Sequence, residues 1–188
     1  MTVDDATLTG LAVRARAGDR LAATRLVDHT YQQVWRLLTV LSDRRVAEDL
    51  TQETYARAFR SLPGFRAEAP VRAWLLAIAR RVAADHLRAA RSRPRIDPDT
   101  DVPGSESGPA PVVPGDLGES VALHALVDGL EPDRKLAFVL TQLLGLSYLE
   151  AARVCDCPVG TVRSRVARAR DDLAGHLAGR AGRATGSG

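Results

Sequence analysis

A segment rich in proline, glycine and acidic residues divides the chain into two parts. Residues 96–119 contain five prolines, four glycines and six carboxylates, and no basic residue. Such a segment buries too little apolar surface to offset the entropy lost on ordering. We therefore predict a flexible acidic linker between two folded units, residues 5–95 and 120–178, with a disordered tail at 179–188.

Both units are predicted to be all-α, which makes the fold class two small helical domains. Aromatic residues are only 4% of the chain, so each core depends mainly on Leu, Val and Ala, a composition that favours helices over a β sandwich. Apolar residues of the first unit recur at helical spacing over four segments. These segments are residues 6–16, 20–41, 44–61 and 70–91.

The predicted helix at 44–61 carries a separate polar face. At 100° per residue its inward stripe consists of Val46, Ala47, Leu50, Thr54, Ala58 and Leu62. Asp49, Gln52 and Glu53 lie at i, i+3 and i+4 on another face. Two carboxylates and an amide carry the wrong charge for DNA. They are either solvated surface residues or a contact for a basic or hydrogen-bonding protein partner.

The predicted helix at 70–91 carries a dense arginine face opposite its apolar stripe. Residues 80–95 contain six arginines and one acid, Asp85. Small alanines between the arginines would let a polyanion approach closely. A solvated arginine face is the alternative to phosphate contact. The candidate DNA-binding residues here are Arg80, Arg81, Arg88 and Arg91.

The second unit has the pattern of a helix-turn-helix motif. Glu131 and Pro132 open a helix that Gly145 ends, and Ser147 with Glu150 forms a capping box at the next helix start. The turn at residues 155–158 follows, and a second, basic helix is predicted from about residue 159 to 173. Two helices joined by a tight turn, the second of them basic, are typical of this DNA-binding motif.

The second helix of this motif is predicted to present polar residues to a DNA groove. Its buried stripe consists of Val159, Val162, Val166, Ala169 and Leu173. Thr161, Ser164, Arg165 and Arg168 lie opposite, where side chains can reach base edges. Arg163 and Arg170 lie on the flank, where phosphates are closer. A plain amphipathic hairpin would also need the stripe, but not this arginine placement.

No pattern in the sequence indicates an enzyme, a metal site or a cofactor. Cys155 and Cys157 are one residue apart, which is neither a disulfide framework nor a C-x-x-C motif. The histidines lack metal-ligand spacing, and Lys135, the only lysine, does not follow glycine as a phosphate loop requires. No apolar run is long enough to span a membrane and the N-terminus is acidic, so we expect a cytoplasmic protein. Either packing or redox control would explain the cysteines.

Three segments follow one another along the chain: residues 48–59, residues 74–88 and residues 146–170. They resemble, in that order, region 2.2, regions 2.3 to 2.4 and region 4.2 of the extracytoplasmic-function (ECF) subfamily of σ70-type bacterial RNA polymerase sigma factors. Within that subfamily the chain resembles the actinobacterial sigma C type. The resemblance covers nearly the whole chain. It implies a σ2 domain and a σ4 domain without an intervening σ3 domain.

For the first unit, the resemblance implies binding to the β′ clamp of core RNA polymerase and melting of the −10 promoter element. Asp49, Gln52 and Glu53 match the clamp-binding positions. The loop at residues 63–70 matches the loop that captures a flipped base. Arg81 stands where the family commonly has Asn, so the resemblance supplies no −10 sequence preference.

For the second unit, the resemblance implies docking on the polymerase β flap and recognition of the −35 element. The residues that read it would be Thr161, Arg163, Ser164, Arg165 and Arg168. The acidic linker would run through the RNA exit channel, either imitating RNA charge or serving as an inert spacer. Whether an anti-sigma factor binds the chain stays open, as do the promoter and the inducing signal.

Two other functions compete with promoter recognition as a polymerase subunit. A helix-turn-helix regulator that acts without joining the polymerase would share the second unit but leaves residues 5–95 unexplained. A protein that uses helical faces only to bind other proteins would bind duplex DNA without a steep salt dependence. We expect an alternative sigma factor that directs promoter-specific initiation.

Overall fold

The computed structural model describes residues 3–92 and 127–184, and every regular element in this part of the chain is helical. The predicted linker at 96–119 lies outside the described residues. The helices are, in order, α1 (Asp5–Arg16), α2 (Arg20–Leu41), α3 (Arg44–Ser61), η1 (Leu62–Gly64), α4 (Val71–Ser92), α6 (Pro132–Phe138), η2 (Val139–Leu143), α7 (Tyr148–Cys155) and α8 (Val159–Ala184). The all-α prediction is confirmed. No described helix combines the length and apolar character that crossing a membrane requires.

Aspartate side chains cap the N-terminal ends of α1, α2 and α3. Asp4 accepts a hydrogen bond from the Thr7 amide at 2.9 Å, and Asp19 accepts one from the Ala22 amide at 2.9 Å. Asp43 caps α3 through the Arg45 amide. Such caps satisfy amides that have no partner inside the helix. The four helices of the first unit begin and end within one residue of the predicted bounds.

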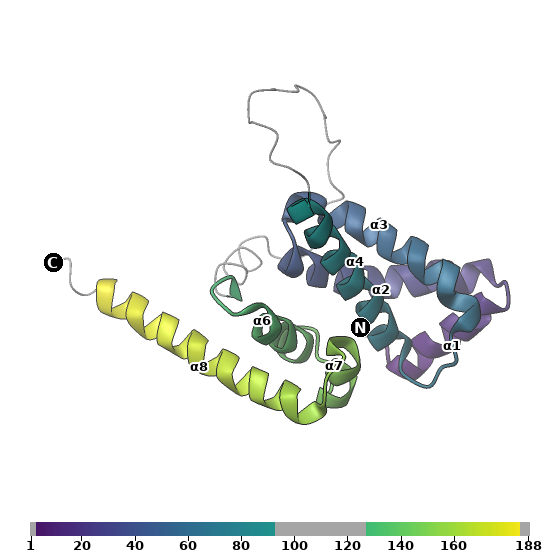
Figure 1. Ribbon diagram of the computed structural model, residues 1–188. Coiled ribbons are helices and arrows are strands. Elements are labelled where there is room, and N and C mark those ends of the chain that lie inside the picture. The colour runs from purple at the N-terminus through teal and green to yellow at the C-terminus, as the bar shows by residue number, and fades with distance from the viewer. Residues whose placement is uncertain (1–2, 93–126, 185–188) are drawn as a thin grey trace, which may run out of the picture.

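Helix α2 forms the centre of the first unit, where it packs against α1, α3 and α4 (Figure 1). Leu37 and Leu38 of α2 and Leu75 and Leu76 of α4 are almost completely buried. Removing each such side chain from water contributes about 1.5–3 kcal/mol to stability. The predicted inward stripe of α3 is buried except at Val46, which is half-buried.

The helix-turn-helix of the second unit consists of α7 and α8. The Ser147–Glu150 capping box is present, since the Ser147 hydroxyl accepts from the Glu150 amide and the Glu150 carboxylate accepts from the Ser147 amide. Burial opposes ionisation of Glu150, but the hydrogen bonds with Ser147 and the charge of Arg72 together lower its pKa. Asp156 ends α7 in the left-handed conformation, with φ of 55°, which turns the chain sharply toward α8.

Helix α8 is longer than the sequence predicts. It extends from Val159 to Ala184, whereas the pattern of apolar residues ends at Leu173 and the chain beyond residue 177 was expected to fray. No proline follows Pro158, and Ala, Leu and Arg, which favour helices, dominate the extension. The helix therefore continues after its buried stripe has ended. Residues 185–188, the rest of the predicted tail, lie outside the described residues.

The two units pack against each other through α4 and α7 (Figure 1). Arg72 of α4 is largely buried; it pairs with Asp5 of α1 at 3.0 Å and donates to the Leu144 carbonyl at 3.3 Å. Arg80 of α4 donates to the Val154 carbonyl at 3.3 Å. Burial raises the pKa of Asp5, although Arg72 opposes the shift. The sequence predicts the two units but not this contact.

Candidate nucleic-acid interface

The polar side of α8 is exposed as the sequence predicts. Val162, Val166, Ala169 and Leu173 are buried against α6 and α7, whereas Arg163, Ser164 and Arg168 are exposed and Thr161 is half-buried. The Ser164 hydroxyl donates to the Thr161 carbonyl at 2.9 Å, so its oxygen stays available as an acceptor. This side of α8 can present hydroxyl and guanidinium groups to base edges in a major groove.

Arg165 is placed differently from its neighbours on α8. Its guanidinium pairs with the carboxylate of Asp133 on α6 and lies 3.4 Å from the Cys157 sulfur, and 24% of its side chain is exposed. Arg165 therefore has to exchange Asp133 for DNA before it can read a base. Sequence reasoning missed Asp133, because a contact between residues so far apart in sequence leaves no local pattern.

The two flanking arginines of α8 have weaker partners. The Arg163 guanidinium lies 5.9 Å from the centre of the Tyr148 ring. Arg170 donates to the Gln142 amide oxygen at 2.7 Å. Neither interaction neutralises the guanidinium charge, so both side chains can attract a phosphate.

The turn of the helix-turn-helix borders a shallow hollow. Its volume is about 390 Å³, and it is lined by Leu149, Ala152, Arg153, Asp156, Cys157, Pro158 and Val159. Leu149 is 56% exposed, one of the most exposed large apolar side chains among the described residues. Burial raises the pKa of the neighbouring Cys155 thiol to about 12, so this thiol stays protonated at neutral pH. Cys155 is 4% exposed and lies in the hydrophobic core.

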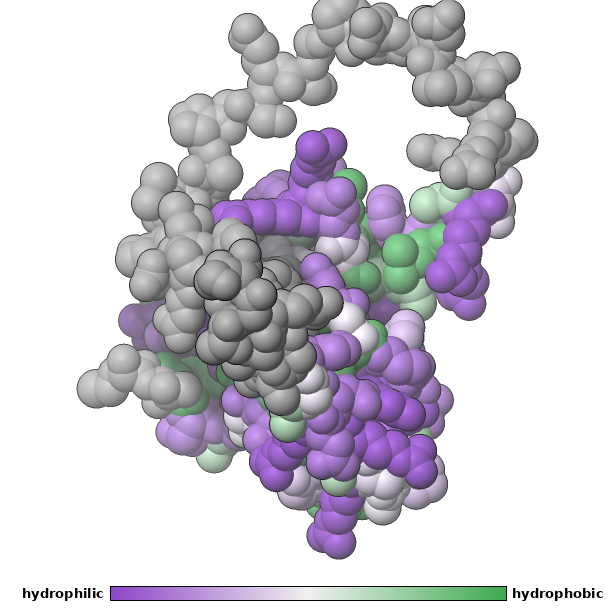
Figure 2. Space-filling view, turned by 90° about the vertical axis from the view of Figure 1, so that its left-hand side faces the viewer, coloured by the Kyte–Doolittle hydropathy of each residue, from purple (hydrophilic) through white to green (hydrophobic). Residues whose placement is uncertain are grey.

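The arginine face of α4 is only partly open. Arg81, Arg88 and Arg91 are exposed, whereas Arg80 is half-buried at the contact with α7. Figure 2 shows a molecular face covered mostly by hydrophilic side chains with small hydrophobic patches between them. The exposed arginines can bind a phosphate backbone, Arg88 after its ion pair with Asp85 is released.

The loop between η1 and α4 is anchored by one aromatic side chain. Phe65 is buried and packs on the Trp74 ring, with 5.0 Å between the ring centres. Ala67 adopts the left-handed region at φ 57°, and the flanking Arg66 and Glu68 are exposed. The loop thus holds polar side chains outward beside the start of α4.

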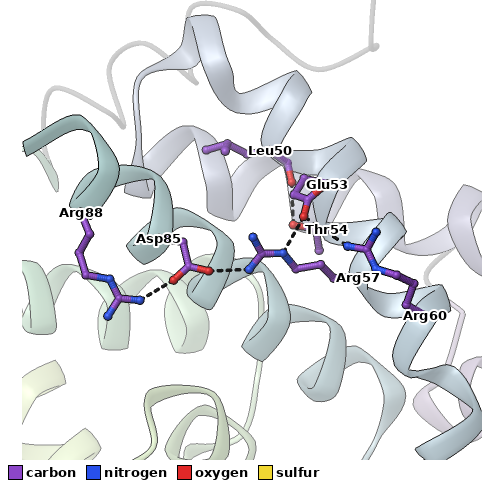
Figure 3. A network of polar contacts seen from close by, with 7 residues as sticks. All are labelled: Leu50, Glu53, Thr54, Arg57, Arg60, Asp85 and Arg88. Atoms are coloured by element: carbon purple, nitrogen blue, oxygen red, sulfur yellow. Dashed lines mark hydrogen bonds and ion pairs between the residues drawn. The ribbon is translucent and has the colours of Figure 1, made fainter. Parts of the chain in front are cut away.

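On α3, Asp49 and Gln52 are exposed and Glu53 is half-buried. The Glu53 carboxylate accepts from Arg57 at 2.7 Å and from Arg60 at 3.4 Å (Figure 3). Arg57 also pairs with Asp85 of α4 at 2.5 Å. Within the described part of the chain, Asp49 and Gln52 have no side-chain hydrogen bond, so their polar groups are open to a partner.

Arg57 and Asp85 are functional candidates that sequence reasoning missed. The spacing of Glu53 with Arg57 and of Asp85 with Arg88 is visible in the sequence as helical pairs. The bond that joins these pairs crosses from α3 to α4 and depends on their packing. Among the described residues, no group of His, Cys, Asp and Glu side chains could hold a metal ion.

Two family comparisons match both units of the chain. Residues 26–93 match the Sigma-70 region 2 family, and residues 120–173 match the Sigma-70, region 4 family. The chain is 46% identical over 175 residues to the ECF RNA polymerase sigma factor SigC of Mycobacterium tuberculosis, with 90% of this chain and 91% of that protein covered. It is 35% identical to the ECF RNA polymerase sigma-E factor of Escherichia coli, with 87% and 90% covered.

Solved structures agree with the fold. The sigma factor RpoE in complex with the anti-sigma factor NepR from Bartonella quintana matches with a TM-score of 0.66 and 26% identity, covering 82% of this chain and 95% of that chain. CnrH in complex with the cytosolic domain of CnrY matches with a TM-score of 0.71 and 24% identity, covering 92% and 98%. The second likeness concerns the fold alone.

Proposed function

Since the chain belongs to the ECF subfamily of RNA polymerase sigma factors, we propose that it binds core RNA polymerase and directs promoter-specific transcription initiation. The observation that carries this proposal is the presence of region 2 and region 4 matches in order, one on each helical unit. In this function the first unit recognises and melts the −10 element, and the second recognises the −35 element.

We assign core polymerase binding to Asp49, Gln52 and Glu53 of α3. The exposed Asp49 and Gln52 support this assignment, since an acidic and amide-bearing face suits basic or hydrogen-bonding groups on a protein. The same face would repel DNA phosphates. The partner surface is the β′ clamp, and the second unit docks on the β flap.

We assign −10 contacts to Arg80, Arg81, Arg88 and Arg91 of α4. Guanidinium groups bind phosphates as forked donors, and several of them on one helix follow a DNA strand. Arg80 has to release the Val154 carbonyl before it contacts DNA. The exposed positions of the other three support the assignment.

We assign −35 recognition to Thr161, Arg163, Ser164, Arg165 and Arg168 of α8. The helix-turn-helix geometry supports this assignment, because its second helix is the one that enters a major groove. Ser164 and Arg168 are exposed on the N-terminal half of α8, the part of a recognition helix that contacts base edges.

An anti-sigma factor is a further proposed partner, because the related RpoE was solved bound to one. We place the protein in the cytoplasm with the polymerase, as a factor without its own catalytic site. A helix-turn-helix regulator that acts without joining the polymerase is not favoured, since the region 2 match on residues 26–93 would then have no purpose.

The test is a titration of the labelled chain with core polymerase, beside a titration of the chain alone with duplex DNA. We expect tight core binding and only weak binding to DNA by the free chain. Tight binding of the free chain to one defined operator, with no affinity for core polymerase, would contradict the proposal.

A further inference from the structure

A row of alternating charges connects the acidic face of α3 with the arginine face of α4 (Figure 3). Glu53 accepts from the Arg57 Nε, and Asp85 accepts from the Arg57 Nη1 through one carboxylate oxygen. The other oxygen of Asp85 accepts from Arg88. Arg57 thus bonds a carboxylate on each helix, and Asp85 is shared by two arginines.

Arg57 is the strongest influence on both carboxylates. Its hydrogen bonds hold the pKa of Glu53 and the pKa of Asp85 below their usual values, and Arg88 contributes less at Asp85. Between 37% and 42% of the side chains of Arg57, Glu53 and Asp85 is exposed, so each bond can exchange with an incoming group. Arg88 is 74% exposed and is the member nearest to open solvent.

We propose that Arg57 and Asp85 are positioning residues that couple Glu53 on the polymerase-facing side to Arg88 on the DNA-facing side. This rests on the proposed function, which assigns those two faces. A donor group of a protein partner that binds Glu53 competes with Arg57. Arg57 then interacts more strongly with Asp85, which weakens the hold of Asp85 on Arg88 and frees Arg88 for a phosphate.

The coupling gives the free chain a lower DNA affinity than the polymerase-bound chain. Before Glu53 engages a partner, Asp85 neutralises Arg88, the exposed arginine in the middle of the α4 face. Afterwards the same face gains one available cation. One more phosphate contact makes DNA binding steeper in salt by about one unit of log–log slope.

The experiment uses the variant Glu53→Gln. It removes the ion pair between Glu53 and Arg57, as a partner bound to Glu53 would. The full-length chain is titrated with a labelled mixed-sequence duplex at several low salt concentrations. The matched control is Asp28→Asn, which removes one exposed carboxylate from α2 of the same unit. Thermal melts of every variant accompany the titrations.

We expect Glu53→Gln to raise DNA affinity roughly two- to fivefold beyond the Asp28→Asn control, the range that an exposed ion pair allows. In chains that already carry Arg57→Gln or Arg88→Gln, adding Glu53→Gln should raise DNA affinity no more than adding Asp28→Asn does. The coupling would be overturned if Glu53→Gln raised DNA affinity no more than Asp28→Asn in the otherwise wild-type chain. It would also be overturned if Glu53→Gln still raised affinity more than the control in the Arg57→Gln chain. This DNA titration contains no polymerase, so its result is independent of the transcription test of the proposed function.

Discussion

Arg165 illustrates what a single residue's place in a pattern can and cannot reveal. The helical wheel places it opposite the predicted buried stripe of α8. The burial of Val162, Val166, Ala169 and Leu173 confirms that stripe except at Val159, which is half-buried. Its ion pair with Asp133 was not predictable, since it depends on how α6 packs across α8. The sequence therefore identifies the face of the helix, whereas the partner of each side chain requires the fold.

We expect Arg165→Ala to cost about 1–3 kcal/mol in promoter binding and to relax selection at one −35 position, because a lost fork onto a base edge affects that base alone. The measurement is the affinity of the polymerase-bound chain for a set of promoters that differ singly in the −35 element. Asp133→Asn is the companion variant; it releases Arg165 and should raise affinity without changing the preferred base.

Arg170→Ala should weaken binding to all sequences alike and reduce the salt slope by about one, as expected for a lost phosphate contact. The same promoter set, measured at several salt concentrations, provides the comparison with Arg165→Ala. Equal losses at every sequence for both variants would mean that α8 does not enter the groove with Arg165 toward the bases.

At the level of the element, the helix starts of the second unit were predicted more closely than the end of α8. The Ser147–Glu150 capping box and Pro132 mark their helices in the sequence, and both are found where expected. No residue in the sequence marks the end of α8. The helix continues through Gly175 without a break, because the Ala, Leu and Arg residues around it favour helix. The sequence also carries no sign that the helix opened by Pro132 changes to a π-helix at η2, where Val139 and Leu140 are buried.

We expect Ser147→Ala to lower the free energy of unfolding by about 0.5–2 kcal/mol, because the amide at the start of α7 loses its acceptor. Urea unfolding of the full chain measures the change. Thr24→Ala on α2 is the control, an exposed hydroxyl that caps no helix, and should change stability by no more than about 0.5 kcal/mol. Equal effects of the two variants would show that the cap contributes nothing.

The acidic face of α3 allows polymerase binding to be separated from folding. We expect the triple variant Asp49→Ala, Gln52→Ala and Glu53→Ala to bind core polymerase far more weakly while its melting temperature changes little, since exposed substitutions change stability by no more than about 0.5 kcal/mol each. The double variant without the Glu53 change is the stricter form, because Glu53 also bonds Arg57.

A core-binding titration beside a thermal melt checks both variants. If the triple variant bound core polymerase with wild-type affinity, the assignment of polymerase binding to this face of α3 would be wrong. A large fall in melting temperature would instead assign these side chains a structural role.

For the whole molecule, the sequence predicts two helical units and the function of each, but not how they meet. Arg72 and Arg80 lie about two turns apart on α4, a helix that the pattern divides into an apolar stripe and an arginine face. Their bonds to Leu144 and Val154 join segments on either side of the linker. No local periodicity encodes such a contact, because it depends on the shapes of two completed units.

The central claim is that this chain gives core RNA polymerase a promoter specificity that the core enzyme lacks. Transcription by purified core polymerase on a genomic promoter library, with and without the chain, tests it most directly. We expect initiation from a distinct set of promoters that share −10 and −35 elements, only when the chain is present. Equal transcripts with and without the chain would contradict the claim.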